Sequence, residues 1–566
     1  MPRVTNPILP GCYPDPSICR VGEEFFLVCS SFEYFPGLPI FRSRDLAHWD
    51  QIGHVIDRAG MLDFTGIASS GGLYAPTIRH HQGTFWVICT LVDQGSPITH
   101  APGRGNFIVT ATDAAGPWSD PVFLDVDGCD PSLFFDDDGR VWAHANRLIP
   151  ADRAAWHDQC EVWLRELDPQ AMQLTGPEYV IWDGAVRGGV WTEAPHIYQR
   201  DGTYYLLTAE GGTEIHHAVV VARSQSVTGP YEGNKANPIL THRHLGQGQS
   251  IIGVGHADLV EAPDGSWWAV LLGMRPYGGY HYNLGRETFL VPVTWEDGWP
   301  VLAPGVGKVT CSVEVPFASI VAGKTPGTMS AEPCGTALDP GDLRWTTLRE
   351  PWDTFARRDG SAWVLATSPV GTRDVGTPAF LGVRQCDRDV DVTAEFTFSG
   401  LLRGNAVGLL VRQSEKDFAA ISLRPPQDKE SRGPFSVVVD HAQGGVTAEV
   451  NNQGLPGTEY AEISRITLAL QVRGQDYTFG VMGEDGRDGR GDGGNAELGE
   501  YGDGGRAELG EVGAFVPLHT VDGRTLDTVA TGGFLGLWIG AIAIRDSPSD
   551  PPCEVRLEKF TYAPVE

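Results

Sequence analysis

The chain has 566 residues, with 71 Gly, 40 Pro and a formal net charge of -30. At roughly 100–200 residues per domain, this length excludes a single small module and allows two to four domains. The negative charge disfavours nucleic acid and anionic membranes as partners, and the many Gly and Pro residues disfavour long helices. We therefore expect a turn-rich, all-β globular protein.

A secretory signal consists of a basic segment followed by an apolar run. The N-terminal residues MPRVTNPILPGCYPDP contain no such pattern. A cytoplasmic location is therefore expected. The longest apolar stretch, 532–544, is shorter than the roughly 20 residues that a helix needs to cross a bilayer, so it predicts a buried strand. None of the ten cysteines forms a CxxC pair, which argues against zinc and redox motifs and predicts mostly buried free thiols.

Five segments of the first half repeat one pattern, in which a Pro or Ala is followed by an apolar residue, a turn glycine, an aromatic or bulky apolar pair and an apolar strand. The five segments begin at Asp15, Ala75, Asp130, Ala194 and His256. Their second residues are spaced by 60, 55, 64 and 62 positions, and the turn glycine follows the second residue by six to eight positions. A fixed period of this kind indicates a repeat architecture.

Each repeat also holds a second pair of strand-like runs, for example NFIVTATDAAGPW in the second repeat. Two hairpins in a period near 60 residues predict a four-stranded propeller blade, so five repeats predict a five-bladed β-propeller. A large β-sandwich whose hairpins resemble one another by chance is the weaker alternative, because the internal spacing is nearly constant.

The periodic region predicts a propeller domain over residues 1–315, followed by a linker rich in Gly, Pro, Ser and Thr over 316–340. Apolar and polar residues then alternate through 390–398, the pattern of a half-buried strand. Further strand-like runs predict a second all-β domain, a β-sandwich, over 341–566. Within it, the Gly, Asp and Glu-rich segment 483–513 is predicted to be a disordered loop.

Three repeats place a carboxylate where successive innermost strands of a propeller would face one another. Asp15 and Asp130 directly precede a Pro, and Glu193 lies one position further out. Asp-Pro is also a common way to begin a turn, so blade punctuation is the alternative interpretation. Three converging carboxylates near aromatic residues suit the hydrolysis of a glycosidic bond, which needs a general acid and a second carboxylate.

Long segments of the chain resemble the β-xylosidase and α-L-arabinofuranosidase members of glycoside hydrolase family 43. The segments that carry this resemblance are NPILPGCYPDPSICR, SSFEYFPGLPIFRSRDL, GGLYAPTIRHHQGTF, DPSLFFDDDGRVW, EAPHIYQRDGTYYLLTAEGG, GHADLVEAPDGSWW and LGRETFLVPV. The C-terminal half resembles the concanavalin A-like β-sandwich of the two-domain members. The resemblance therefore extends over essentially the whole chain and implies a propeller followed by a sandwich.

The resemblance also implies an inverting mechanism with three carboxylate roles. Asp15 in YPDPS would be the general base that activates water, and Glu193 in TEAPHIY the general acid. Asp130 in CDPSL would orient the acid and raise its pKa through its negative charge.

Further residues are implied to bind the sugar. Arg286 in LGRET matches the arginine that reaches sugar hydroxyls, and Phe32 in SSFEYFPG matches an aromatic wall of the innermost subsite. Tyr74 stands where other members carry Trp, and His217, beside AEGGT, is expected to border the pocket. In GGFLGLWIG, Trp538 matches the sandwich aromatic that closes the pocket and would make the enzyme exo-acting; a buried core Trp is the alternative.

The fifth repeat carries His256 at its first position, where some family members hold a central calcium through water and a histidine. A satisfied, hydrogen-bonding His is the alternative interpretation, since calcium prefers oxygen ligands. No cofactor is expected to be required, and a structural calcium is left open.

The leading hypothesis is an exo-acting hydrolase that removes terminal β-1,4-xylosyl units from xylo-oligosaccharides. An α-L-arabinofuranosidase, or an enzyme with both activities acting on arabinosylated oligosaccharides, is the nearest alternative. A retaining fructan hydrolase would show WMNDPNG and RDP motifs, whereas this chain has YPDPS and CDPS. A non-catalytic sugar-binding propeller would have no reason to keep all three carboxylates. A homo-oligomer is left open.

Overall fold

The computed structural model divides into two compact units. The first comprises Met1–Pro276 and Leu284–Ala331, and the second comprises Tyr277–Asn283 and Glu332–Glu566. Most of the predicted linker and of the predicted disordered loop lies outside the residues that the structure describes. The described residues are 3–93, 102–246, 248–317, 337–426, 435–454, 464–483 and 513–565.

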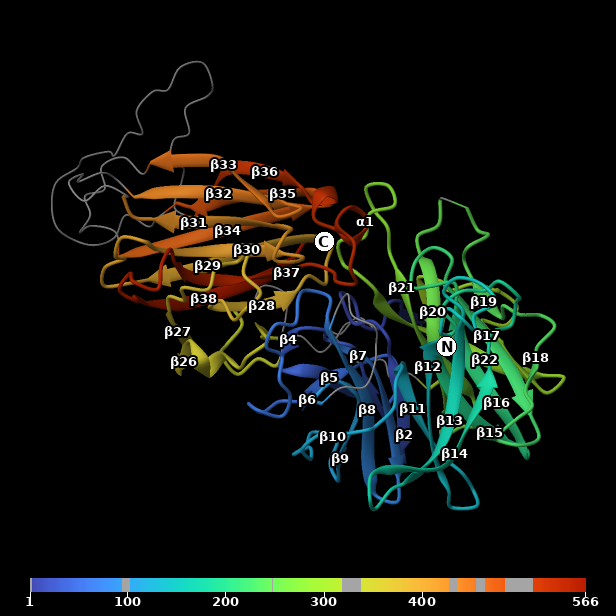
Figure 1. The fold of residues 1–566 in the computed structure, drawn as a ribbon. Helices are drawn as coiled ribbons and strands as arrows, with labels where there is room; N and C mark the ends of the chain where they lie inside the picture. Colours follow the sequence, from blue (N-terminus) through green and yellow to red (C-terminus); the bar gives the residue numbers. More distant parts are fainter. Residues whose placement is uncertain are drawn as a thin grey trace, which may run out of the picture. The chain divides into compact units, whose positions relative to one another are not determined.

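The first unit is a five-bladed β-propeller, as the repeats predict, and each blade is built on an antiparallel four-stranded sheet (Figure 1). Blade 1 contains β2 (Ser17–Val21), β3 (Glu24–Val28), β5 (Gly37–Ser43) and β6 (Asp50–Ile56); blade 2 contains β7 (Gly72–His81), β8 (Thr84–Val92), β9 (Gly105–Ala111) and β10 (Val122–Phe123). Blade 3 contains β11 (Cys129–Phe135), β12 (Val141–Leu148), β13 (Cys160–Asp168) and β14 (Gln173–Trp182). Blade 4 contains β15 (Glu193–Arg200), β16 (Thr203–Glu210), β17 (Ala218–Ser224) and β18 (Glu232–Gly233), with β19 (Leu240–Thr241) paired to β17. Blade 5 contains β20 (Ile252–Glu261), β21 (Trp267–Met274), β22 (Glu287–Glu296) and β23 (Trp299–Leu302).

Two short strands outside the blades join the ends of this unit. The first strand, β1 (Arg3–Thr5), pairs with β24 (Ser312–Glu314). A further short strand, β4 (Tyr34–Phe35), lies between β3 and β5 in the chain.

The turn glycine of every repeat sits in the left-handed backbone region that glycine adopts most readily. Their φ angles lie between 60° and 87°, and no atom lies within 4 Å of the place a Cβ would take. The backbone conformation, and not crowding, therefore explains why glycine recurs in these hairpins. The five glycines are Gly22, Gly83, Gly139, Gly202 and Gly265.

The first residue of each repeat also has a positive φ, although none of the five is glycine. These first-position residues have φ angles from 43° to 56°. In blades 2 to 5 the strand register shifts at the same place, which marks a β-bulge. A left-handed non-glycine residue costs energy, and such strain collects at functional sites. The first-position residues are Asp15, Ala75, Asp130, Ala194 and His256.

The second unit is a β-sandwich of two antiparallel sheets, as predicted. One sheet has the order β26 (Ala356–Asp359), β27 (Ala362–Ala366), β38 (Glu554–Pro564), β29 (Asp389–Thr397), β34 (Arg465–Arg473), β35 (Asp476–Met482) and β36 (Phe515–Asp522). The other has the order β28 (Phe380–Arg384), β37 (Trp538–Arg545), β30 (Asn405–Arg412), β31 (Phe418–Arg424), β32 (Ser436–Gln443) and β33 (Val446–Gly454). The remaining elements are β25 (Thr347–Leu348), η1 (Trp352–Thr354), η2 (Gly523–Thr525) and α1 (Thr528–Thr531).

Sequence patterning explains the core of the sandwich. Buried and half-buried residues alternate along β29, so its apolar residues Val390, Val392, Ala394 and Phe396 enter the core. The apolar stretch 532–544 contains most of β37, while its first residues precede the strand. The predicted buried strand is therefore correct for the second part of the stretch.

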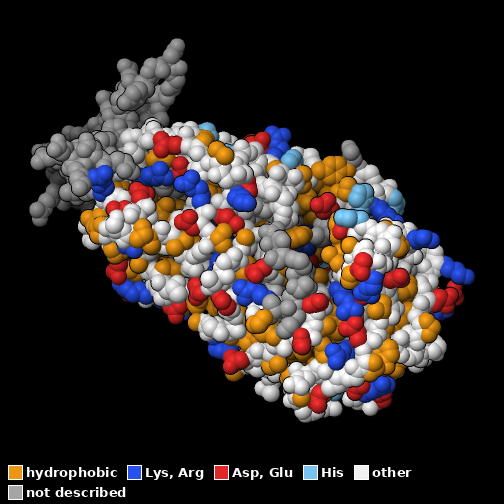
Figure 2. Space-filling view, in the orientation of Figure 1, with side chains coloured by type: hydrophobic (Ala, Val, Ile, Leu, Met, Phe, Trp, Pro, Cys, Tyr) orange, Lys and Arg blue, Asp and Glu red, His pale blue; other side chains and the backbone are white. Residues whose placement is uncertain are grey.

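No helix among the described residues is long and apolar enough to cross a membrane. The nine cysteines that the structure describes are free thiols, and most are buried. On the face shown in Figure 2, acidic and basic side chains are interspersed with apolar ones.

Candidate active site

Asp15 is the most strongly held of the three predicted carboxylates. Its Oδ1 accepts a hydrogen bond from Arg286 Nη1 at 3.0 Å, and its Oδ2 accepts one from Ser30 Oγ at 2.6 Å. Burial alone would raise the pKa of Asp15, but the charges of Arg286 and His256 and the Ser30 hydrogen bond together lower it below its usual value. Asp15 is therefore ionised at neutral pH.

Among the residues that the structure describes, no arginine or lysine hydrogen-bonds to Asp130. Its Oδ2 accepts a hydrogen bond from the backbone N–H of Ala194 at 3.1 Å. Burial raises the pKa of Asp130, and the negative charge of Asp15 raises it further, while His256 and the Ala194 N–H act in the opposite direction. Asp130 and Asp15 are therefore close enough to influence each other's titration.

Glu193 is the first residue of β15, where its backbone pairs with Ala209. Its pKa is raised well above the usual value, first by burial and then by the charges of Asp130 and Asp15, with Arg286 opposing. The strand register shifts between Glu193 and His196, which marks a β-bulge. Glu193 directly precedes Ala194, the first-position residue of this repeat.

Arg286 and two aromatic rings form a wall beside Asp15. Arg286 is buried, and its Nη1 also donates to Thr213 Oγ1 at 3.0 Å. The Arg286 guanidinium lies 5.7 Å from the centre of the Phe32 ring, and Phe32 meets Tyr74 edge to face at 5.5 Å. The structure thus brings the predicted sugar-binding residues Arg286, Phe32 and Tyr74 together with Asp15.

Two predicted histidines also lie near Asp15. Nδ1 of His256 is 3.6 Å from Asp15 Oδ1. His217 is buried, and its Nδ1 hydrogen-bonds to the carbonyl oxygen of Gly253 at 3.2 Å. Burial, followed by the charge of His256, lowers the pKa of His217 to about 3. His217 is therefore neutral, and because Nδ1–H donates to Gly253, its Nε2 is left as an acceptor.

The residues around His256 do not fit direct calcium binding. Calcium takes six to eight oxygen ligands, whereas the described residues contain no group of three or more His, Cys, Asp and Glu that could hold a metal ion. The guanidinium of Arg79 also lies close by, since it binds Asp258, two positions after His256, at 2.8 Å. Because Asp258 neutralises this guanidinium, Arg79 does not decide the question, and calcium held by His256 through water stays a prediction.

Trp538 begins β37 in the sandwich and is fully buried. The guanidinium of Arg384 lies 5.1 Å from the centre of its ring. Its assignment as the residue that closes the sugar pocket stays a prediction.

Sequence reasoning missed a second group of residues, which lie two positions after the first-position residues of the repeats. The third-position residues are Ser17, Thr77, Ser132, His196 and Asp258. Asp258 is fully buried and accepts hydrogen bonds from both Nη atoms of Arg79, from Ser17 Oγ and from Tyr198 Oη. These bonds join blades that are distant in the chain.

The sequence also gave no role to Ser30 and Thr213, which hold Asp15 and Arg286 in place. Ser30 additionally accepts a hydrogen bond from the backbone N–H of Ala75 at 2.7 Å. Ser30 stands inside a segment that carries the family resemblance, SSFEYFPGLPIFRSRDL, and Thr213 directly follows another, so the resemblance is the signal that could have found them.

This propeller holds one carboxyl with a lowered pKa and two with raised pKa values beside aromatic rings and an arginine, and this combination defines the class as a glycosidase. The model of glycosyl hydrolases family 43 matches residues 4–300, and that of the beta xylosidase C-terminal concanavalin A-like domain matches residues 339–562. The chain belongs to glycosyl hydrolase family 43.

Similar proteins agree with this assignment. A xylosidase/arabinosidase of Butyrivibrio fibrisolvens is 43% identical over 431 residues, which cover 75% of this chain and 80% of that protein. A non-reducing end alpha-L-arabinofuranosidase of Bacteroides ovatus is 35% identical over 84% of each chain. The crystal structure of a xylan beta-1,4-xylosidase from Bacillus halodurans C-125 has a TM-score of 0.83 at 29% identity and covers 99% of this chain and 100% of its own.

Proposed function

We propose that this glycosidase is an inverting, exo-acting enzyme that removes terminal β-1,4-xylosyl units from xylo-oligosaccharides. Asp15 acts as general base, Glu193 as general acid, and Asp130 raises the pKa of the acid. The observation that carries the proposal is the opposite direction of the pKa shifts of Asp15 and Glu193. Two carboxyls whose pKa values are moved apart can serve as base and acid at one pH.

In the proposed reaction, Asp15 takes a proton from a water molecule while the water oxygen attacks the anomeric carbon. The bond from that carbon to the leaving oxygen breaks, and Glu193 gives its proton to the leaving oxygen. The hydrogen bonds from Arg286 and Ser30 keep Asp15 ionised and fix its orientation. Because water attacks the face opposite the leaving group, the anomeric configuration inverts.

A second candidate function is the release of terminal α-L-arabinofuranosyl units. The names of two similar proteins favour it, since one is a xylosidase/arabinosidase and the other a non-reducing end alpha-L-arabinofuranosidase. The same base, acid and arginine would serve both reactions.

The test is a side-by-side comparison of kcat/KM on an aryl β-xyloside, an aryl α-L-arabinofuranoside and xylobiose. Higher values on the xyloside and on xylobiose support the proposal, and a preference for the arabinofuranoside supports the second candidate. Inactivity on all three would contradict both.

Proton NMR of the first sugar released gives the stereochemical outcome. The proposed mechanism requires α-xylose as the first product. A first product that retains the β configuration would overturn the roles given to Asp15 and Glu193.

A further inference from the structure

Blade 4 continues beyond the acid Glu193 as a rim made by two segments of chain. The pairing of Glu193 with Ala209 is followed by a hydrogen bond from the Gly211 N–H to the carbonyl oxygen of Val190 at 2.9 Å. The rim therefore begins beside Glu193, the residue proposed to protonate the leaving oxygen.

Trp191 stands on this rim, two residues before Glu193. It is 39% exposed and has a φ of 50°, which is a strained backbone conformation for a bulky side chain. Its ring lies flat enough against Gly212 that a Cβ there would be 2.5 Å from Trp191 Cε3. The backbone N–H of Trp191 donates to the carbonyl oxygen of Asp158 at 3.1 Å. The fold thus holds an aromatic ring in an exposed position next to the acid.

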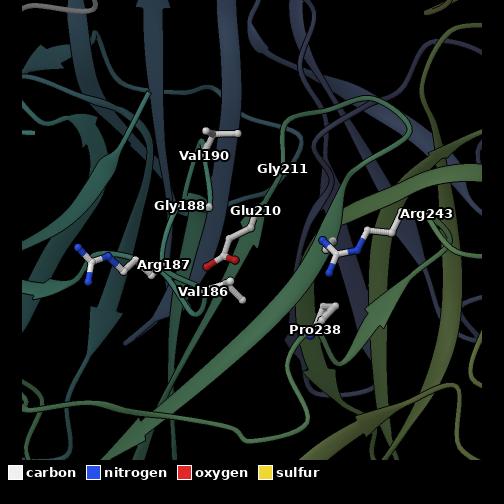
Figure 3. Close-up of a pocket in the computed structure, with 10 residues that line it drawn as sticks. Val186, Arg187, Gly188, Val190, Glu210, Gly211, Pro238 and Arg243 are labelled. Atoms are coloured by element: carbon white, nitrogen blue, oxygen red, sulfur yellow. The ribbon is translucent and has the colours of Figure 1, made fainter. Parts of the chain in front are cut away.

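A pocket of about 240 Å³ lies beside the rim, lined by residues that include Val190, Gly211, Glu210 and Arg243 (Figure 3). Glu210 is only 6% exposed, and its Oε1 accepts a hydrogen bond from the backbone N–H of Ala185. Among the described residues, no N–H or O–H group hydrogen-bonds to Oε2 of Glu210. In Figure 3 the guanidinium of the exposed Arg243 is turned toward Glu210 from the other side of the pocket.

These groups match the chemistry of a pentose. The C–H face of a sugar ring packs on an aromatic ring, while its hydroxyl groups need both acceptors and donors. A carboxylate oxygen accepts hydrogen bonds, and a guanidinium donates several in a fixed fork. Trp191 supplies the aromatic ring on the rim, and Glu210 and Arg243 supply an acceptor and a donor in the pocket, which Val190 and Gly211 of the rim also line.

We propose that Trp191 and the pocket of Glu210 and Arg243 bind the leaving-group part of the substrate. The first pentose of the leaving group lies on Trp191, and hydroxyl groups of the second pentose of the leaving group bind Glu210 and Arg243. This inference rests on the proposed function, because it assumes that Glu193 protonates the leaving oxygen. It predicts that the site binds xylo-oligosaccharides more tightly than it binds a single xylose.

Binding measurements in a Glu193→Gln background test the inference, because this variant leaves the ligand intact. Calorimetry compares xylotriose, which reaches the rim, with xylose, which fills only the terminal position. We expect Trp191→Ala to weaken xylotriose binding about tenfold, the typical loss for a truncated aromatic contact, and to leave xylose binding unchanged. Trp191→Phe should restore most of the xylotriose affinity.

Arg243→Ala should weaken xylotriose binding severalfold without changing xylose binding. Arg20→Ala is the matched control, since Arg20 is an exposed arginine on blade 1 that donates a hydrogen bond to the carbonyl oxygen of Gly22. Equal losses for xylose and xylotriose, or no loss for either in Trp191→Ala, would overturn the inference.

The failure of the proposed function gives a different result. In that case the wild-type protein fails to cleave xylobiose and aryl β-xyloside, whatever the binding of the variants. Cleavage by the wild type together with unchanged xylotriose binding in Trp191→Ala would overturn the inference alone.

Discussion

Charged side chains occur at both the first and the third positions of the repeats, which are two residues apart. The two sets of charges are neutralised differently. Among the first-position residues and Glu193, the charge of Arg286 lowers the pKa of Asp15 and of Glu193, whereas Asp130 is opposed by the charge of Asp15 and stabilised by that of His256. Among the third-position residues, the one carboxylate, Asp258, is matched by the two hydrogen bonds of Arg79.

This difference separates a structural site from a chemical one. Asp258 is completely satisfied, and although burial opposes it, the charge of Arg79 lowers its pKa far below the usual value. Burial and the charge of Asp15 raise the pKa of Asp130, and burial and the charges of Asp130 and Asp15 raise the pKa of Glu193. A buried carboxyl with a raised pKa can serve as an acid, whereas a matched ion pair joins blades together.

The largest effect is expected for Asp15→Asn, which removes the base but keeps the shape of the side chain. We expect kcat/KM to fall by at least about a thousandfold on every substrate, because no other described group takes the water proton. The folded state should survive, and circular dichroism checks this. A loss of less than tenfold would contradict the assignment of Asp15 as base.

The opposite outcome is expected for Asp258→Asn at the third position. We expect the free energy of unfolding to fall by about 3–5 kcal/mol, because Arg79 would remain buried without its carboxylate. Urea unfolding measures the change. The control is Asp264→Asn, in an exposed turn, which should cost less than about 1 kcal/mol.

The pH dependence of stability follows from the same ion pair. Because the folded pKa of Asp258 lies below its usual value of 3.8, its contribution is present above that value and is lost as the pH falls through the folded pKa. Asp258→Asn should therefore show a weaker acid destabilisation than the wild type. Equal acid destabilisation in both proteins would argue against the pair as a source of stability.

Glu193→Gln should distinguish substrates by their leaving groups. We expect a loss of about 100-fold or more on xylobiose, whose leaving oxygen needs a proton, and a smaller loss on an aryl xyloside with an acidic phenol. The slope of log kcat/KM against the pKa of the leaving phenol measures this difference. Equal losses across the series would refute the assignment of Glu193 as acid.

The smallest expected effect is a shift in the pH profile of Asp130→Asn. Activity requires protonated Glu193, so it falls as the pH rises through the raised pKa of Glu193. Removing the charge of Asp130 lowers that pKa, so the alkaline limb should move to lower pH. Asp137→Asn, which alters an exposed turn, should leave the limb in place.

Much of the fold was predictable because its signals are local. Each repeat contains a turn glycine and an aromatic or bulky apolar pair that indicate a hairpin, and five copies at a near-constant spacing predict five blades. The alternation along residues 390–398 likewise predicts strand β29 and its buried face. Asp15, Asp130 and Glu193 could be selected because blade equivalence places the repeat starts around one axis.

The residues that sequence reasoning missed act through partners that are distant in the chain. Arg79 and Asp258 are 179 positions apart, and Thr213 reaches Arg286 across 73 positions. No local sequence pattern around Arg79, Asp258, Thr213 or Arg286 predicts these contacts. The bulges with left-handed residues were also hidden, since Asp15, Ala75 and Ala194 are ordinary L residues whose strain only the surrounding structure maintains.

By itself, the sequence determined the all-β class, the five blades, the sandwich and the three carboxyls, because periodicity and residue type are local properties. Only the tertiary structure decided that the pKa of Asp15 is lowered while that of Glu193 is raised. The physical reason is that a pKa depends on burial and on neighbouring charges, and here those neighbours come from other blades. The same carboxyl group therefore becomes a base, an acid or one half of an ion pair according to the neighbours that folding provides.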